Sequence, residues 1–349
     1  MKIAQIAPLY EAVPPKLYGG TERVVAHLCD ALVELGHDVT LFAAADARTT
    51  AKLVAVRDQA IRLDPAPLRS DVAAHLNMLC EVRRRHAQFD VLHFHVDLLH
   101  FPIFESLADK TVTTLHGRLD LKDLPAVYAH WPQFSLVSIS DAQRQALPEG
   151  NWLATVGHGV PLRQYAFRRT PERPYLAFLG RISPEKRPDV AIRLAHRAAI
   201  PLKIAAKVDR TDASYFEVVV KPLLNDPLIE FVGEIGDERK PEFLGGAAAL
   251  LFPIDWPEPF GLVMIEAMAC GTPVIAWNRG SVPEIIENGL TGYIVESEEQ
   301  AVAAITRVPA LDRQRIRATF EHHFTATSMA RRYLSVYAKL VGPALAVAS

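Results

Sequence analysis

The chain alternates short, almost wholly apolar runs with longer segments whose apolar residues recur at the spacing of a helix. Residues 3–9 form one such run, residues 21–35 have helical periodicity up to Gly36, and residues 38–43 form a second run. Strand, helix and strand in this order make a βαβ unit, in which the two strands pair in parallel. We therefore expect a parallel sheet with helices on both faces.

The alternation continues through two series separated by a break. The first series predicts strands at 3–9, 38–43, 91–96, 111–115 and 136–139, and helices at 21–35 and 71–86. The second predicts strands at 175–179, 202–206, 229–232, 248–252, 274–277 and 292–295, and helices at 188–199, 241–247, 261–270, 300–306, 312–324 and 328–341. The segment 157–174 between them is rich in arginine and proline, which is typical of a connection between domains. We expect two similar α/β domains, 1–162 and 163–326, with a cleft between them.

Length and composition fit this architecture and count against several classes of protein. A chain of 349 residues exceeds what one hydrophobic core usually supports. Apolar residues make up 50% of it, but no run approaches the length of about eighteen that a membrane-spanning helix needs. The formal charge of −2 gives no electrostatic basis for general nucleic-acid binding. The cysteines are scattered among apolar neighbours, as reduced thiols are, and no signal peptide is evident, so we expect a cytoplasmic protein.

The most informative segment is 250–271. It predicts the end of a buried strand, a loop in which two prolines flank Glu258, and a helix that Gly271 terminates. Glu266 is the only polar residue between 262 and 270. A buried carboxylate is costly unless a donor pairs with it or it opens onto a polar cavity. One carboxylate just before a helix and another about a turn within it suit a ligand with many hydroxyl groups.

Two cations follow the first strand of the second series. Arg181 and Lys186 come after the strand 175–179, at the end of a parallel strand where ligands bind in open α/β sheets. A guanidinium and an ammonium suit a phosphate, although two solvated loop charges would give the same local sequence. The N-terminus of the helix 261–270 would add backbone N–H donors for a diphosphate.

The glycines and the acidic residues of the chain bear on the choice of cofactor. Gly19 and Gly20 precede the first helix and would let a phosphate approach the backbone, although such a pair also marks an ordinary turn. No Gly-x-Gly-x-x-Gly follows the first strand, which counts against a nicotinamide enzyme. There is also no Asp-x-Asp pair to hold a divalent metal on a nucleotide diphosphate. We therefore expect no metal and no other cofactor.

Three histidines accompany the strands of the first series. His93 and His95 lie on one face of the strand 91–96 by its period of two. With no further ligand cluster in view, packing in the core or along the cleft is favoured over a metal pair. His116 follows the strand 111–115, so we expect it at the cleft, with a satisfied loop histidine as the alternative.

Taken together, these motifs resemble those of the retaining glycosyltransferases of the GT-B fold, family 4. The resemblance covers nearly the whole chain. It rests on the Glu258…Glu266 spacing followed by Gly271-Thr272-Pro273-Val274, on Gly180-Arg181 with Lys186, on Tyr18-Gly19-Gly20-Thr21-Glu22, and on His116-Gly117. It implies two Rossmann-like domains with parallel sheets facing a central cleft, and a C-terminal helix (327–349) that crosses back to the first domain.

The resemblance also implies an activity and a role for each motif. A hexosyl unit would move, with retention and without a metal, from a nucleotide-diphosphate sugar, UDP- or GDP-linked, to an acceptor hydroxyl. Glu266 would hold the ribose and Glu258 the donor sugar, Arg181 and Lys186 would bind the diphosphate, and His116 would contact the sugar near the reaction centre. The implied catalytic residues are His116, Glu258, Arg181 and Lys186; the further donor contacts are Gly19, Gly20, Phe260, Gly261, Leu262, Val263 and Glu266; and the acceptor candidates are Tyr18, His93, His95 and Asp97.

The chain departs from the family pattern in two places, and two other functions stay open. His158-Gly159-Val160-Pro161 stands where many relatives have Asn-Gly-Val/Ile-Asp, and Arg187 replaces a frequent small residue. A non-catalytic nucleotide-sugar-binding module and a sugar-nucleotide epimerase would use the same fold. The acceptor would be a sugar, a lipid-linked molecule or another small molecule, with at most peripheral contact to a membrane.

Overall fold

The computed structural model describes residues 1–66, 68–171 and 174–342. The chain folds into two compact units. Unit 1 comprises Met1–Gly159 and the C-terminal helix α13 (Ala326–Val341), and unit 2 comprises Val160–Thr325. The sequence placed the corresponding divisions after residues 162 and 326.

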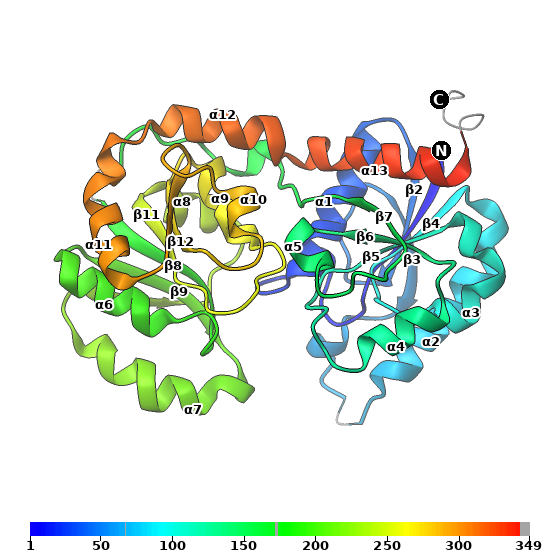
Figure 1. Cartoon of the computed structure of the whole chain (residues 1–349). Helices are drawn as coiled ribbons and strands as arrows, with labels where there is room; N and C mark the ends of the chain where they lie inside the picture. Colours follow the sequence, from blue (N-terminus) through cyan, green and yellow to red (C-terminus); the bar gives the residue numbers. More distant parts are fainter. Residues whose placement is uncertain (67, 172–173, 343–349) are drawn as a thin grey trace. The chain divides into compact units, whose positions relative to one another are not determined.

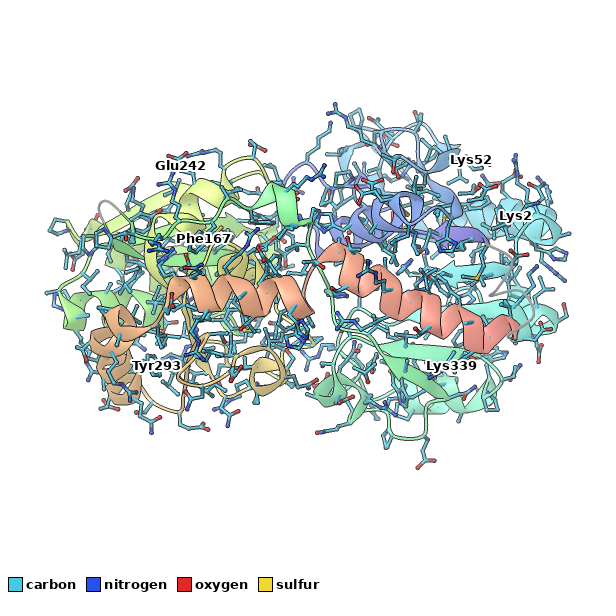
Figure 2. All side chains as sticks on the ribbon, turned by 90° about the horizontal axis from the view of Figure 1, so that it is seen from above. Lys2, Lys52, Phe167, Glu242, Tyr293 and Lys339 are labelled. Atoms are coloured by element: carbon cyan, nitrogen blue, oxygen red, sulfur yellow. The ribbon has the colours of Figure 1, made fainter. Side chains whose placement is uncertain are left out.

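Unit 1 is built on a seven-stranded sheet in the order β3-β2-β1-β4-β5-β6-β7, in which all neighbours are parallel. Its strands are β1 (Lys2–Ile6), β2 (Asp38–Ala44), β3 (Lys52–Arg57), β4 (Val91–Phe94), β5 (Thr111–Thr114), β6 (Ser135–Ser138) and β7 (Trp152–Thr155). Its other helices are α1 (Gly20–Glu34), α2 (Asp71–Arg85), α3 (Phe101–Phe104), α4 (Leu124–His130) and α5 (Asp141–Arg144). Helix α13 packs against α1, next to which it lies in Figure 2.

Unit 2 is built on a six-stranded sheet in the order β10-β9-β8-β11-β12-β13, again parallel throughout. Its strands are β8 (Tyr175–Ile182), β9 (Leu202–Val208), β10 (Ile229–Gly233), β11 (Ala247–Phe252), β12 (Val274–Trp277) and β13 (Gly292–Val295). Its helices are α6 (Pro188–Ala198), α7 (Ala213–Tyr215), α8 (Lys240–Gly245), α9 (Leu262–Ala269), α10 (Val282–Ile285), α11 (Glu298–Arg307) and α12 (Arg313–His323). Figure 1 shows α6 and α11 on one side of this sheet and α8, α9 and α12 on the other. The predicted α/β class with two parallel sheets is confirmed.

Short 3₁₀ or π segments complete both units. They are Ile61–Leu63, His86–Gln88, Glu105–Lys110, Leu162–Gln164, Arg210–Asp212, Phe216–Val220, Lys221–Asn225 and Val308–Ala310. Among the residues that the structure describes, no helix has both the length and the apolar character that crossing a membrane requires.

Several boundaries differ from the prediction for local physical reasons. Strand β1 ends at Ile6 and not at residue 9, because Pro8 has no N–H to donate to a ladder. The edge strands β3 and β7 have no run of buried residues, so their sequences lack the pattern of a buried strand. The helical stretch around α7, before β10, was also absent from the prediction.

Both sheets reverse their strand order at one place. In unit 1 the reversal lies between β1 and β4, and in unit 2 between β8 and β11. In open parallel sheets, ligands bind outside the carboxyl ends of the strands at such a point. The segments that follow β1, β4, β8 and β11 are therefore the places where each unit would hold a ligand.

Candidate active site

The end of β8 and the turn after it hold two of the predicted cations. Arg181 is the penultimate residue of β8 and pairs with Lys207 of β9 in the sheet. The chain then turns so that the backbone N–H of Lys186 donates to the carbonyl of Ser183 at 3.1 Å. Arg187 takes a left-handed φ of 53° before Pro188 begins α6. Arg181 and Lys186 therefore lie at the carboxyl end of β8, as the sequence predicted.

Lys186 and Glu258 form an ion pair, although they come from different loops. The Nζ of Lys186 donates to Oε2 of Glu258, and the indole Nε1 of Trp256 donates to the same oxygen at 2.9 Å. The Lys186 ammonium also lies over the rings of Trp256 and Phe252, at 5.3 and 5.7 Å from their centroids. Glu258 is only 8% exposed. The loops after β8 and β11 are thus joined at the point where the strand order of unit 2 reverses.

Glycine at position 280 allows the backbone of residues 280 and 281 to pack directly against the backbone of Glu258. The N–H of Ser281 donates to the carbonyl of Glu258 at 3.0 Å. Gly280 has a φ of 53°, and a Cβ atom added to it would lie 2.3 Å from the carbonyl oxygen and 2.5 Å from the nitrogen of Glu258. No other residue type fits this close approach without moving the backbone of Glu258.

Arg181 is held by carboxylates of its own surroundings. Its guanidinium pairs with Glu185, four residues along, and its Nε lies 3.3 Å from Oδ2 of Asp212. Arg187 pairs with Asp189 at 3.3 Å and with Asp255 at 3.1 Å. The positive charge at the end of β8 is therefore partly compensated by acidic side chains, and an anionic ligand would compete with them.

The predicted N–H donors lie at the start of α9. Gly261 has a left-handed φ of 79° and precedes Leu262, the first residue of the helix. Leu262 and Val263 are half-buried, whereas Phe260 is 4% exposed. The first-turn N–H groups of a helix have no intrahelical acceptor, so this end of α9 suits an anion.

Gly271 terminates α9 as predicted. Its φ is 77°, and its N–H donates to the carbonyl of Met268 at 2.9 Å. A Cβ atom here would lie 2.7 Å from the ring of Phe167, which is labelled near α12 in Figure 2. Glycine therefore serves both the helix end and the packing of this neighbour.

Glu266 is buried within α9 and is paired inside the protein. Its Oε1 accepts hydrogen bonds from the hydroxyl of Tyr165 at 2.9 Å and from Nζ of Lys240 at 2.8 Å. Lys240 also lies 3.1 Å from Oδ1 of Asp237. Glu266 is 2% exposed and Lys240 is 6% exposed. These donors account for the buried carboxylate, so its assignment to a ribose stays a prediction.

In unit 1 the predicted glycines open the first helix. Gly19 precedes α1 and Gly20 is its first residue. The guanidinium of Arg23 donates to the carbonyls of Gly19 and Leu17, both at 2.7 Å, and so fixes this turn. Gly20 and Tyr18 are exposed. The loop after β1 therefore presents the backbone at Gly20 at the carboxyl edge of the sheet.

The three histidines of unit 1 that the sequence singled out contact one another or residues of the core. The ring centroids of His93 and His95 lie 4.1 Å apart, which agrees with their predicted common face. The Nδ1 of His95 lies 2.8 Å from Nε2 of His116. The ring of His158 stacks on that of His116 at 5.2 Å. In the part of the chain that the structure describes, no three His, Cys, Asp or Glu side chains are grouped to hold a metal ion.

Burial keeps these imidazoles neutral. Loss of hydration lowers the pKa of His116 to about 3. It also holds the pKa of His93, His95 and His158 well below the ordinary value, and the neighbouring histidines lower these values further. His116 is therefore available as a neutral hydrogen-bonding group and not as a cation.

Two of the acceptor candidates are buried. His93 is 0% exposed and its ring nitrogens contact Tyr337 and Thr114, both at 2.8 Å. His95 is 2% exposed and contacts His116. This burial fits the packing role that the sequence favoured for the pair, and their place near an acceptor stays a prediction. Asp97 is exposed in the segment that follows β4 and stays a candidate, as does Tyr18.

Comparison with known families agrees with this arrangement. Residues 18–149 match the sequence model described as "Glycosyltransferase Family 4", and residues 165–319 match the model described as "Glycosyl transferases group 1". The two matches lie one in each unit and together cover most of the chain. The chain belongs to glycosyltransferase family 4.

Several members of the family are similar over different parts of the chain. A phosphatidyl-myo-inositol mannosyltransferase of Propionibacterium freudenreichii is 28% identical over 353 residues, which cover 90% of this chain and 87% of that protein. A D-inositol 3-phosphate glycosyltransferase of Streptomyces griseus is 31% identical over 144 residues, which cover 35% of this chain. That alignment spans only 28% of the Streptomyces protein.

Solved structures of glycosyltransferases share the fold. AviGT4, a glycosyltransferase involved in avilamycin A biosynthesis, has a TM-score of 0.74 and 25% identity, over 97% of this chain and 98% of its own. Anabaena HepE in complex with UDP and glucose has a TM-score of 0.75 and 17% identity, over 96% of this chain and 98% of its own. The predicted GT-B fold is therefore confirmed.

The sequence did not indicate several residues that organise this candidate site. Tyr165 and Lys240 are distant in the chain from Glu266, and no local pattern marks them as its donors. Gly280 lies in an ordinary-looking Arg-Gly-Ser turn. Trp256 lies two residues before Glu258 in a proline-rich loop, and this proximity in the sequence could have indicated that its indole donates to the Glu258 carboxylate.

Proposed function

We propose that this chain transfers a hexosyl unit from a nucleoside-diphosphate sugar to an acceptor hydroxyl, with retention of configuration and without a metal ion. The observation that carries the proposal is the joining of Lys186 and Glu258 beside Arg181, where the strand order of unit 2 reverses. Cations there suit the diphosphate, and a carboxylate suits the hydroxyls of a sugar attached to it.

The ion pair gives Lys186 and Glu258 linked roles. A diphosphate would share the Lys186 ammonium with Glu258, and each new contact of the ammonium would leave Glu258 freer to accept a hydrogen bond from a sugar hydroxyl. Donor binding would thus replace the Lys186–Glu258 contact by two others, one between Lys186 and the diphosphate and one between Glu258 and a sugar hydroxyl. Arg181 and the N-terminus of α9 would stabilise charge that builds on the departing diphosphate.

Proton transfer would depend on the leaving group. The pKa of His116 is lowered to about 3 by burial, so this histidine is a weak base near neutral pH. A departing phosphate oxygen would take the proton of the acceptor hydroxyl on the same face of the sugar, which accounts for retention. The protein would supply orientation and charge stabilisation.

A panel of nucleotide sugars tests the proposal. Acceptor-dependent release of a nucleoside diphosphate, with product of retained configuration and undiminished by EDTA, is the expected result. Binding without turnover would indicate a binding module, and an isomerised donor would indicate an epimerase. Loss of turnover in EDTA, restored by a divalent metal, would refute metal independence. A thermal-shift screen with UDP, GDP and ADP selects the nucleotide, because a ligand at a hundredfold excess over its Kd adds about 2.7 kcal/mol of stability.

Substitution of Arg181 tests the diphosphate site directly. We expect Arg181→Ala to lower kcat by roughly two orders of magnitude, the scale for one preorganised charge-stabilising group. Arg315→Ala, an exposed arginine on α12, makes the same chemical change away from this site and should keep native turnover. Near-native turnover of Arg181→Ala would contradict the diphosphate assignment.

A further inference from the structure

A continuous chain of hydrogen bonds crosses the core of unit 1 and ends at His116. It links the side chains of Tyr333, Thr114, His93, Tyr337, Gln5, His95 and His116, in that order. Every contact along it is between 2.8 and 3.0 Å. Except for His116, every member is buried. The two tyrosines come from α13, so this C-terminal helix supplies two members of the hydrogen-bond chain.

Gln5 sets which group donates and which accepts along this chain of hydrogen bonds. Its Nε2 donates to the hydroxyl of Tyr337 at 3.0 Å, and its Oε1 lies 2.8 Å from Nε2 of His95. An amide oxygen has no hydrogen, so Nε2 of His95 must carry the proton in this contact. Because His95 is neutral, its Nδ1 is then a bare acceptor, and the hydrogen between the two rings belongs to Nε2 of His116.

The other half of the chain agrees with this direction. The Tyr337 hydroxyl accepts from Gln5 and can donate to Nδ1 of His93. Nε2 of His93 can then donate to Oγ1 of Thr114. The rings of His93 and His95 thus each have one donor and one acceptor in use. A reversal would require the Gln5 amide to turn over and the hydrogens of its neighbours to change places together.

The direction leaves His116 with a lone pair on Nδ1. That atom is buried and has no hydrogen-bond partner among the residues that the structure describes. The imidazole is held from one side by its contact with His95 and from the other by the stacked ring of His158, 5.2 Å away at 19°. An unused acceptor on a fixed ring is costly to keep buried unless a ligand supplies a donor.

We propose that Gln5 and Tyr337 set the tautomer of His116, so that its Nδ1 accepts a hydrogen bond from a hydroxyl group of the bound substrate. This role rests on the proposed glycosyl transfer, whereas the tautomer itself does not. Gln5, Tyr337 and His95 would be positioning residues that act through His116. A ring whose pKa is about 3 holds a hydroxyl in place and does not remove its proton.

Nitrogen-15 NMR of the ligand-free, full-length chain with labelled histidines tests the tautomer without any substrate. Two-bond ¹H–¹⁵N correlations distinguish a protonated ring nitrogen from a bare one, and His116→Gln assigns the signals of this ring among the 13 histidines. We expect His116 as a single species with the proton on Nε2. A proton on Nδ1, or a fast-exchanging mixture in the native protein, would overturn the proposal.

Two tyrosines on the same helix provide a variant and its matched control. Tyr337→Phe removes the hydroxyl between Gln5 and His93, so the His116 signals should shift to a mixture of tautomers. Tyr333→Phe removes an equally buried hydroxyl whose one hydrogen-bond partner among the described residues is Thr114, at the opposite end of the hydrogen-bond chain from His116. It should leave the His116 tautomer unchanged. Gln5→Leu interrupts the chain independently and should resemble Tyr337→Phe.

The same variants separate the tautomer from the activity. If the proposal is right, Tyr337→Phe lowers kcat by up to about tenfold, the scale of one neutral hydrogen bond, while Tyr333→Phe does not. An unchanged His116 tautomer in folded Tyr337→Phe or Gln5→Leu would refute the coupling. If no nucleotide sugar is turned over at all, the proposed function fails, but the NMR result still decides whether Gln5 and Tyr337 control the ring.

Discussion

Substitution of Gly280 by alanine should displace Glu258 and cost most of the activity. An added Cβ would lie 2.3 Å from the carbonyl oxygen of Glu258, whereas ordinary contacts begin at 3.4 Å. One of the two backbones must therefore move by about 1 Å, and a misplacement of about 1 Å in a catalytic group can cost roughly 100-fold in rate. The shift would also weaken the hydrogen bond from Ser281 N–H to Glu258, worth about 0.5–1.5 kcal/mol.

Gly289 provides the matched control. It also has a positive φ, of 82°, so Gly289→Ala carries the backbone strain of about 1–2 kcal/mol that any L-residue meets there. Its Cβ would meet nothing within 4 Å. The difference between the two variants therefore isolates the contact with Glu258 from the strain of the left-handed backbone.

Two measurements separate stability from activity. By chemical denaturation, we expect Gly280→Ala to be about 1 kcal/mol less stable than Gly289→Ala, because only the former loses the Ser281 hydrogen bond. With a nucleotide-sugar donor, kcat/KM should fall by about 100-fold in Gly280→Ala and by less than about twofold in Gly289→Ala. Equal turnover of the two folded variants would refute the reasoning, since Glu258 would then tolerate the displacement or not matter for transfer.

Two further predictions concern buried charge. Lys240→Met removes one donor of the buried Glu266 carboxylate and should lower the free energy of unfolding, measured in denaturant, by about 3 kcal/mol. The double variant Lys240→Met/Glu266→Gln should recover part of this loss. A loss below about 0.5 kcal/mol in Lys240→Met would contradict the pairing. Burial lowers the pKa of His100 well below its ordinary value, so unfolding takes up a proton once the pH falls below about 6.5. Below that pH, this histidine lowers the free energy of unfolding by about 1.4 kcal/mol for each pH unit of decrease. Calorimetry at pH 5 should show about one proton fewer taken up on unfolding of His100→Gln, and an unchanged uptake would show that His100 is already charged when folded.

Local pattern predicted the elements of this chain well where both faces of a strand are buried. Strands β4, β11 and β12 are apolar at every residue except His93, and their positions agree closely with the prediction. Strands β3 and β7 lie at the edges of their sheet and are half-exposed, so packing against a single neighbour and not composition decides their conformation.

The candidate site shows the same division between local and long-range information. The sequence indicated that a carboxylate inside α9 needs a partner, but Tyr165 lies 101 residues away from Glu266 and carries no local mark of that contact. Likewise, the period of a strand predicted that His93 and His95 share a face. What covers that face is α13, more than two hundred residues later, and it decides that His93 lies in the core.

The return of α13 to unit 1 has a consequence for how the chain folds during synthesis. Gln5 bonds to Tyr337, which is 332 residues further along, and Tyr333 and Tyr337 are both 0% exposed. Unit 1 contains all of its own strands but therefore cannot bury the central ones until α13 has been made, whereas unit 2 is one continuous segment, Val160–Thr325. Domains usually fold in the order of synthesis, and contacts of high sequence separation form slowly. In this chain unit 2 can therefore complete its packing before unit 1, whose central strands are covered only when α13 has been made.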